Sequence, residues 1–194
     1  GPKPNLIKSM GNKDIARELA FKSNIPICPG ISNITKLSSD DLKNKCENIG
    51  YPLLVKSSAG GGGIGMSVVQ NFKDLPKSIE KTSNMAEKSF GNGDVFIEKF
   101  ITNARHIEIQ IFGFGDKGAV HLYERDCSMQ RRYQKIIEES PAPEIDRILI
   151  ESMANAAVKL SSDVKYQGAG TVEFIYDVEQ KKYYFLEMNT RIQV

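Results

Sequence analysis

Tyr51-Pro-Leu-Leu-Val-Lys56 leads into Ala59-Gly-Gly-Gly-Gly-Ile-Gly65, and Met66-Ser-Val-Val69 follows directly. The two apolar segments are typical of strands, so the glycine run is expected to be the loop of a hairpin. Without Cβ atoms, the backbone N–H groups of such a loop can turn toward an anion at close range. No Gly-Lys-Ser/Thr closes the run and no helix follows it, which excludes a Walker loop and a dinucleotide fingerprint. With Lys56 beside it, the loop predicts a flap that covers a phosphate; the alternative is a plain flexible hairpin tip.

The rest of the chain alternates between helical and strand patterns. Helices are expected over residues 12–24, 41–48, 74–90 and 144–164, and further strands over 95–100, 105–114, 119–125, 170–176 and 182–189. Within 105–114, three isoleucines alternate with His106, Glu108 and Gln110, which therefore share the other face. Strands interrupted by helices, with hairpin-length loops, predict an α+β fold with mostly antiparallel sheets.

Length and composition exclude several classes of protein. The 194 residues allow one large domain or two small ones, and the net charge of +2 gives no argument for nucleic acid or a membrane surface. No apolar run is long enough to span a membrane. The three cysteines are far apart and odd in number, which disfavours disulfides and zinc. A cytoplasmic protein fits these features.

Acidic residues interrupt the last two expected strands. Glu173 lies in Thr-Val-Glu-Phe-Ile, and the two-residue spacing of Glu187 and Asn189 puts both on one strand face. If these strands pair, the oxygen ligands converge in a way that suits magnesium. The alternative for either carboxylate alone is a salt bridge on a solvent-exposed face.

A polar cluster runs from Glu124 to Lys135. Its composition alone favours a solvated loop, and Cys127 within it is interpreted as structural because the sequence gives it no catalytic histidine. His106, on the polar face of its strand, is interpreted from the pattern as a surface residue.

Several longer strings are highly specific when taken together. They are Met-Gly-Asn-Lys13, the segment 51–66 quoted above, Glu98-Lys-Phe, Arg-His106-Ile-Glu-Ile-Gln, Glu124-Arg-Asp-Cys-Ser-Met-Gln-Arg-Arg-Tyr-Gln-Lys135, Glu-Ser-Pro-Ala-Pro143, Gly-Ala-Gly-Thr-Val-Glu173-Phe and Leu-Glu187-Met-Asn-Thr-Arg-Ile-Gln-Val194. In this order they resemble the ATP-grasp portion of biotin carboxylases over essentially the whole chain.

The resemblance implies an ATP-grasp fold. Residues 1–27 would be an N-terminal linker and helix, 28–101 the small flap subdomain, and 102–194 a larger antiparallel-sheet subdomain that is incomplete at its C-terminus. It also implies a ligase that carboxylates biotin with bicarbonate and ATP through carboxyphosphate.

The resemblance further assigns residues to roles. ATP contacts fall on Lys13, Lys56, Gly62, Gly63, Glu98, Lys99, Phe100, Ile101, His106, Glu173 and Glu187. Magnesium or manganese ligands are Glu173, Glu187 and Asn189. Bicarbonate contacts are Lys135, Arg191, Gln193 and Val194, of which Lys135 and Arg191 are the catalytic candidates. Under this assignment His106 is a nucleotide contact rather than a surface residue.

Partners and departures from the family pattern complete the resemblance. The implied partners are a biotin carboxyl carrier domain, a carboxyltransferase component and other copies of the parent chain. Tyr133 replaces a histidine of many members, and Ile64 replaces a basic residue of the acetyl-CoA carboxylase type, so the final acceptor stays open between acetyl-CoA, urea and others. Because the base expected to deprotonate bicarbonate would follow Val194, we expect these 194 residues alone not to carboxylate biotin. The alternatives are another ATP-grasp ligase, of the carbamoyl-phosphate synthetase type, and a module that binds MgATP without turnover.

Overall fold

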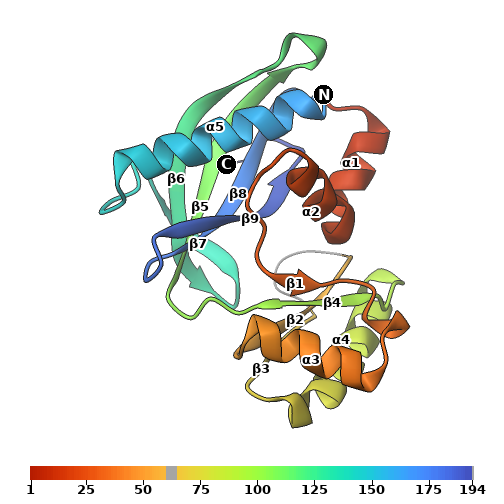
Figure 1. The fold of residues 1–194 in the computed structure, drawn as a ribbon. Helices are drawn as coiled ribbons and strands as arrows, with labels where there is room; N and C mark the ends of the chain where they lie inside the picture. The colour runs from red at the N-terminus through yellow and green to blue at the C-terminus, as the bar shows by residue number, and fades with distance from the viewer. Residues whose placement is uncertain (60–64, 194) are drawn as a thin grey trace. The chain divides into compact units, whose positions relative to one another are not determined.

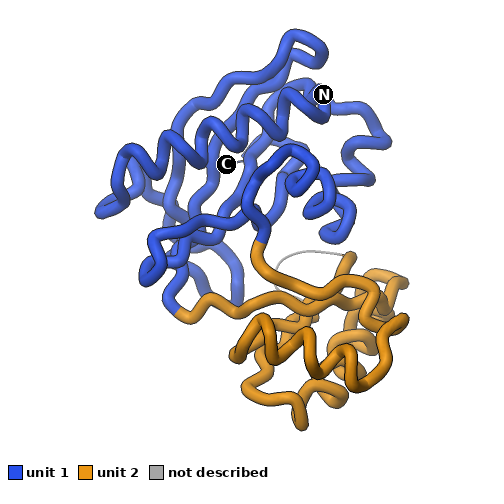
Figure 2. Tube along the Cα trace, viewed as in Figure 1, with its two compact units in different colours: residues 1–27, 103–194 blue, residues 28–102 orange. Residues whose placement is uncertain are grey.

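The structure, a computed structural model, describes residues 1–59 and 65–193. It divides into two compact units (Figure 2): unit 1 combines residues 1–27 with 103–194, and unit 2 is residues 28–102. Each unit has its own sheet and its own hydrophobic core. No helix of the described residues is long and apolar enough to cross a membrane.

Unit 2 is a four-stranded antiparallel sheet with two helices (Figure 1). Its strands are β1 (Gly30–Ile31), β2 (Leu53–Ser57), β3 (Met66–Val69) and β4 (Val95–Lys99), in the order β1-β4-β2-β3. Its helices are α3 (Ser39–Ile49) and α4 (Leu75–Phe90), with short 3₁₀ turns at Ile34–Lys36 and Phe72–Asp74. The Ser38 side chain caps α3 by accepting from the Asp41 N–H, and Gly91, at φ +67°, ends α4.

The predicted hairpin around the glycine run is confirmed on both of its strands. β2 pairs antiparallel with β3, with Lys56 opposite Met66, and the Ser57 N–H donates to the Gly65 carbonyl. Gly65 has φ +72°, a conformation that favours glycine. The loop itself, with Gly62, Gly63 and Ile64, lies outside the described residues, and so does the flap predicted from it.

Unit 1 is a five-stranded antiparallel sheet in the order β7-β6-β5-β8-β9 (Figure 1). Its strands are β5 (Ala104–Phe114), β6 (Ala119–Arg131), β7 (Gln134–Glu139), β8 (Gln167–Asp177) and β9 (Lys182–Asn189), with a 3₁₀ turn at Gly115–Lys117. Its helices are α1 (Pro4–Gly11), α2 (Lys13–Lys22) and α5 (Arg147–Asp163). Helix α5 packs on β5 and β6, whereas α1 and α2 pack on β9.

The alternation predicted for β5 sets the two faces of this sheet. Ile107, Ile109 and Ile111 are fully buried in the core beside α5 residues such as Leu160, which makes this face the apolar one. The opposite face carries His106, Glu108 and Gln110. Polar side chains on successive strands therefore meet on that face.

The interpretation of residues 124–135 as a solvated loop is wrong. Strand β6 continues to Arg131, and β7 begins at Gln134 after a tight turn. The two turn residues, Arg132 and Tyr133, have φ values of +52° and +64°, which match the twist of a two-residue hairpin. Composition failed here because the cluster buries several of its polar groups against partner charges instead of exposing them.

Candidate active site

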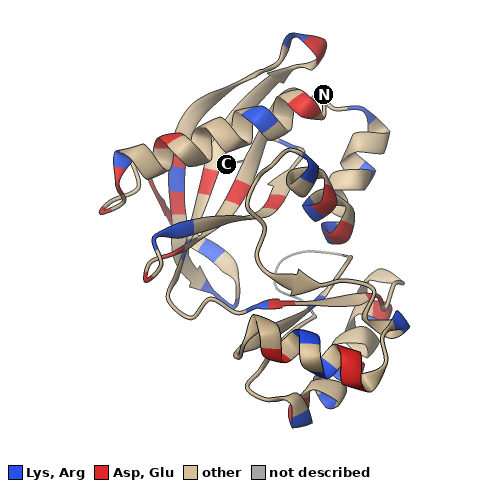
Figure 3. Ribbon diagram, in the orientation of Figure 1, with Lys and Arg blue, Asp and Glu red and all other residues tan. Residues whose placement is uncertain are grey.

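Three acidic positions lie side by side across the polar face of the unit 1 sheet. Glu108 of β5 pairs in register with Glu173 of β8, which pairs with Glu187 of β9. Figure 3 shows such acidic positions on neighbouring strands of this sheet. Residues directly opposite on antiparallel strands have Cβ atoms about 4.5–5.5 Å apart. The predicted pairing that brings Glu173 opposite the Glu187 strand is confirmed.

Glu173 is the most densely bonded carboxylate of this face. Its Oε1 accepts from the Lys135 ammonium at 2.7 Å and from the Asn189 amide at 2.6 Å, and its Oε2 lies 2.5 Å from His106 Nε2. Burial alone would raise the pKa of this carboxyl, but the hydrogen bond from His106 and the Lys135 ammonium lower it to about 2. Glu173 is therefore an anion held by three polar groups.

Lys135 sits between two buried carboxylates. Its Nζ lies 2.5 Å from Glu108 Oε2 and 2.7 Å from Glu173 Oε1. Burial alone lowers the pKa of this ammonium, but Glu173 and Glu108 outweigh it and raise the pKa above the ordinary lysine value. The β6–β7 turn produces this placement because it sets Lys135 opposite Gln130. Lys135 is therefore a charged group fixed on the polar face.

The interpretation of His106 as a surface residue is wrong. Its side chain is 14% exposed, and Gln130 Nε2 lies 2.8 Å from its Nδ1 and 2.7 Å from the Cys127 carbonyl. A carbonyl only accepts, so the nitrogen of the Gln130 amide faces both groups. His106 Nδ1 then accepts from Gln130, and Nε2 carries the proton toward Glu173. Side chains of the neighbouring strands, Glu173 and Gln130, cover this histidine, which the alternation of its own strand does not predict.

The oxygen-rich end of this face fits a magnesium or manganese ion. Asn189 uses its amide nitrogen on Glu173, which leaves its amide oxygen for another partner. The Thr171 hydroxyl, in register with Asn189, is buried and has no hydrogen-bond partner among the described residues. Hard oxygen donors of this kind suit these cations. A Cβ at Gly170 would lie 2.8 Å from the Asn189 carbonyl, so glycine permits the close approach of the two strand ends.

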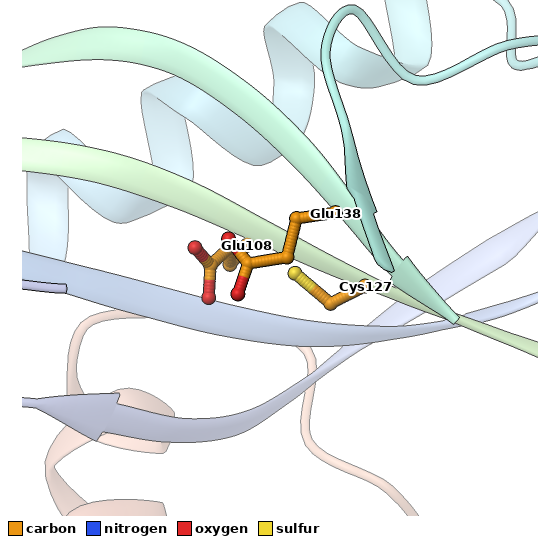
Figure 4. Close-up of side chains that lie close together, drawn as sticks. All are labelled: Glu108, Cys127 and Glu138. Carbon is orange, nitrogen blue, oxygen red and sulfur yellow. The ribbon is translucent and has the colours of Figure 1, made fainter. Parts of the chain in front are cut away.

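A second cluster, Glu108, Cys127 and Glu138, has its ligand atoms within 4.8 Å of one another (Figure 4). Both Glu108 oxygens already bond cations, Arg125 at Oε1 and Lys135 at Oε2. Burial, followed by the charge of Glu108, raises the pKa of the Cys127 thiol to about 12, so it stays protonated. With the thiol protonated and Glu108 bonded to two cations, these side chains form an ion-pair cluster in which Cys127 is buried.

Unit 2 contains a separate buried ion pair. Lys56 Nζ lies 2.9 Å from Glu98 Oε2, with relative exposures of 7% and 9% for the two side chains, and 5.6 Å from the centre of the Phe96 ring. The Lys99 ammonium donates to the carbonyls of Gly50 and Tyr51, where α3 ends. The side chain of Lys99 thus holds the end of β4 against the α3–β2 connection.

The other predicted site residues are placed by their own elements and hydrogen bonds. Arg191 donates to the Ile192 carbonyl and to Gln193 Oε1, and Val194 is outside the described residues. Lys13 is the first residue of α2. Phe100 and Ile101 follow β4, and the Phe100 N–H donates to the Pro52 carbonyl.

Comparison with known proteins decides the family. The family model described as "Carbamoyl-phosphate synthase L chain, ATP binding domain" matches residues 12–194. The chain belongs to this family. Among curated members, biotin carboxylase 1 of Bacillus subtilis is 47% identical over 194 residues, and urea amidolyase of Saccharomyces cerevisiae is 45% identical over 194 residues. Both alignments cover the whole chain but only 43% and 10% of these relatives, so the chain spans less than half of their length.

Solved structures agree with this family assignment. A biotin carboxylase of Campylobacter jejuni has a TM-score of 0.92 at 41% identity, covering 100% of this chain and 43% of that one. The biotin carboxylase domain of Hydrogenobacter thermophilus 2-oxoglutarate carboxylase, in complex with MgADP, ADP and bicarbonate, has a TM-score of 0.90 at 41% identity, covering 100% and 42%. The predicted resemblance to biotin carboxylases and the α+β ATP-grasp fold are confirmed.

Sequence reasoning about this family member missed the partners of its predicted site residues. Glu108, Arg125 and Gln130 were not predicted as site residues, yet they bond Lys135 or His106 directly or through one carboxylate. The alternation of β5 was the available signal for Glu108, since it shares a face with His106. Gln130 had no such signal, because its stretch was interpreted as a loop. Arg125 is the last residue of the strand expected over 119–125, but the pairing of that strand with 105–114 was not predicted.

Proposed function

We propose that this chain is the ATP-binding part of a biotin carboxylase, an ATP-grasp ligase that carboxylates biotin with bicarbonate. The observation that carries the proposal is the charged Lys135 fixed between Glu108 and Glu173, beside the oxygen donors of Glu187 and Asn189. This arrangement offers one cationic side chain for a small oxyanion and a set of hard oxygens for a divalent cation. The names of its relatives support the same activity.

The proposed reaction has two stages. A bicarbonate oxygen bonds to the γ-phosphorus of ATP as the bond to ADP breaks, giving carboxyphosphate. Carboxyphosphate then releases CO₂ and phosphate, and CO₂ bonds to the biotin ring nitrogen, whose proton passes to phosphate. Phosphoryl transfer depends mainly on positioning and on neutralising the charge of phosphate oxygens. Fixed cationic and hydrogen-bonding side chains suit that task.

The roles of individual residues follow the chemistry of their side chains. Lys135 and Arg191 are the proposed catalytic groups, holding bicarbonate with Gln193 and Val194, since ammonium and guanidinium groups neutralise an oxyanion. Proposed nucleotide contacts are Lys13, Lys56, Gly62, Gly63, Glu98, Lys99, Phe100, Ile101, His106, Glu173 and Glu187. Glu173, Glu187 and Asn189 would hold magnesium or manganese, which supplies a Lewis acid for the phosphate oxygens.

The test is bicarbonate-dependent ATP cleavage stimulated by free biotin, in a protein of its relatives' length that contains this chain. We expect Glu173→Gln to lower the rate about 10²–10³-fold, the range for a lost transition-state-stabilising group. Glu179→Gln is the matched control, because Glu179 is exposed in the turn after the same strand. A wild-type protein without biotin stimulation, or equal effects of both variants, contradicts the proposal.

The second candidate is a ligase of the carbamoyl-phosphate synthetase type, which the description of the family model favours. It also passes through carboxyphosphate, but it needs ammonia rather than biotin. The same assay separates the two, because ammonia would then replace biotin as the stimulating substrate. A protein that binds a non-hydrolysable ATP analogue in calorimetry but cleaves no ATP would instead be a binding module.

The proposed function also implies partners and an assembly for the whole protein. We propose a biotin carboxyl carrier domain and a carboxyltransferase component as partners, and a parent protein that assembles from several copies. The subdomain boundaries 28–101 and 102–194 and the cytoplasmic location stay predictions. Relatives named pyruvate carboxylase and urea amidolyase leave the final acceptor open.

A further inference from the structure

We infer that Arg125 is a positioning residue for Lys135 and that it acts through the carboxylate of Glu108. The inference rests on the proposed function for what Lys135 does, but its geometry stands without it. Arg125 of β6 is the register partner of Glu108 and bonds its Oε1, while Lys135 bonds Oε2. One buried carboxylate therefore links the two cations.

Lys135 needs such a link because its own strand holds it weakly. β7 is an edge strand of the sheet, and most of its residues are exposed. The side chain of Lys135 is 22% exposed, and its position is set by bonds to Glu173 and Glu108. Glu173 is also a proposed cation ligand and nucleotide contact, so its oxygens would bond these groups in addition to Lys135. Glu108 has no proposed role toward the divalent cation or the nucleotide, and its Oε2 accepts from Lys135.

Glu108 is held rigidly only when both of its oxygens are bonded. Its side chain is 1% exposed, so water cannot replace a lost partner. Arg125 fixes Oε1, which leaves Oε2 aimed at the Lys135 ammonium. A carboxylate without Arg125 can rotate about its last bond and shift the lysine with it.

Arg125 is itself fixed by further acceptors. The side-chain N–H of Gln110 donates to the Gly170 carbonyl at 3.0 Å. This bond turns the amide oxygen of Gln110 toward Arg125, and a guanidinium nitrogen donates to that oxygen at 3.0 Å. Glu138 Oε2 lies 3.5 Å from Arg125 Nε. The planar guanidinium thus connects Gln110, Glu108 and Glu138 in one orientation, which an ammonium could not do. The backbone of β8 is in this way linked to Lys135.

The kinetic test compares Arg125→Met with Arg105→Met in a protein of its relatives' length. Arg105 is a matched control: its side chain is 19% exposed against 22% for Arg125, and it bonds Asp126, whose strand position faces the α5 side of the sheet. We expect Arg125→Met to raise KM for bicarbonate about tenfold or more, since small misplacements of a positioning group are costly. In Arg125→Met the KM for MgATP should change by less than about threefold. In Arg105→Met the KM for bicarbonate and the KM for MgATP should both change by less than about threefold.

A second measurement tests the geometry in the 194-residue chain without any activity. The ¹⁵N relaxation of lysine ammonium groups reports their order, and Lys56, paired with Glu98 in unit 2, is the internal reference. In Arg125→Met the Lys135 ammonium should lose order relative to the wild type, while Lys56 stays ordered. Unchanged order of Lys135, or equal loss in Arg105→Met, overturns the inference.

A double-mutant cycle shows whether Arg125 acts through Glu108. If it does, adding Arg125→Met to Glu108→Gln should raise KM for bicarbonate by less than about threefold, because the carboxylate to be positioned is already gone. Independent, multiplying losses contradict the inference. If the wild type has no bicarbonate-dependent ATP cleavage, the proposed function fails, and the ammonium measurement still decides the role of Arg125.

Discussion

The two units each fix one lysine on the sheet face opposite their hydrophobic core, but they balance its charge differently. Lys56 of unit 2 is bonded to the buried carboxylate of Glu98 and lies near the Phe96 ring. Lys135 of unit 1 is bonded to two carboxylates, one of which also bonds Arg125. The Lys56–Glu98 ion pair joins one ammonium to one carboxylate, whereas in the unit 1 cluster Lys135, Glu108 and Glu173 each bond at least two other side chains.

The comparison shows that the number of bonds a lysine makes does not determine how much stability is lost when that lysine is removed. In a network, a carboxylate that loses one partner keeps others: Glu173 keeps His106 and Asn189 when Lys135 is removed. At the Lys56–Glu98 pair, removal of the lysine takes away the ammonium that is bonded to a buried carboxylate. The unit 1 face also has three aligned acidic positions, Glu108, Glu173 and Glu187, and two of them are the carboxylates proposed to hold the divalent cation.

The largest expected effect on stability is at the Lys56–Glu98 pair. Lys56→Met should destabilise unit 2 by about 3 kcal/mol, because it takes away the ammonium bonded to the buried Glu98 carboxylate. Lys135→Met should destabilise unit 1 by only about 1–2 kcal/mol, although that lysine makes more bonds. Hydrogen exchange of β2 and β4, compared with β5 and β8, measures the two units separately.

The double variant Lys56→Met with Glu98→Leu controls for the lost charge. Replacing both members of a buried pair by apolar groups is often close to neutral, so much of the lost protection should return. If Lys135→Met instead costs more than Lys56→Met, the network gives no redundancy and the comparison between the two units is broken.

The sequence predicted the backbone of both regions better than their charge networks. The hairpin containing Lys56, the isoleucine alternation of β5 and the pairing of β8 with β9 follow from periodicity and turn residues, which act locally. The continuation of β6 beyond Arg125 and the strand β7 were missed because their polar side chains are stabilised by partners on other strands, as Lys135 is by Glu108 and Glu173. Such cross-strand partners depend on register, which a single segment does not reveal.

The Arg105–Asp126 pair, on the apolar side of the unit 1 sheet, adds a third ion pair to the comparison, one whose contribution to stability depends on pH. Burial alone would raise the pKa of the Asp126 carboxyl, but hydrogen bonds from Ser128 and Arg105 lower it. A carboxyl whose pKa is lowered by folding stabilises the protein above its ordinary pKa of about 3.9, and this contribution disappears as the pH falls through the folded value. Arg105→Met should therefore cost about 1–2 kcal/mol at neutral pH and progressively less below about pH 4.

Urea unfolding of wild type and Arg105→Met at pH 7, 5 and 3 tests this expectation. The difference between the two proteins should be nearly the same at the first two values and clearly smaller at the third. A difference that stays constant down to pH 3 would show that Arg105 contributes through packing of its stem or its bond to the Pro143 carbonyl, not through the charge of Asp126.

The smallest expected effect belongs to a solvent-exposed pair, which sets the lower limit for the comparison. Lys159 and Asp163 lie one turn apart on α5 with Nζ and Oδ2 2.8 Å apart, yet their side chains are 50% and 42% exposed. Water and salt screen such a pair, and both side chains lose rotamer freedom when they hold one geometry. Lys159→Gln should change the free energy of unfolding by less than about 0.5 kcal/mol, and less still in high salt. Urea unfolding at low and high ionic strength measures this, and a loss comparable to that of Lys56→Met would mean that bond length, rather than burial, decides what an ion pair contributes in this protein.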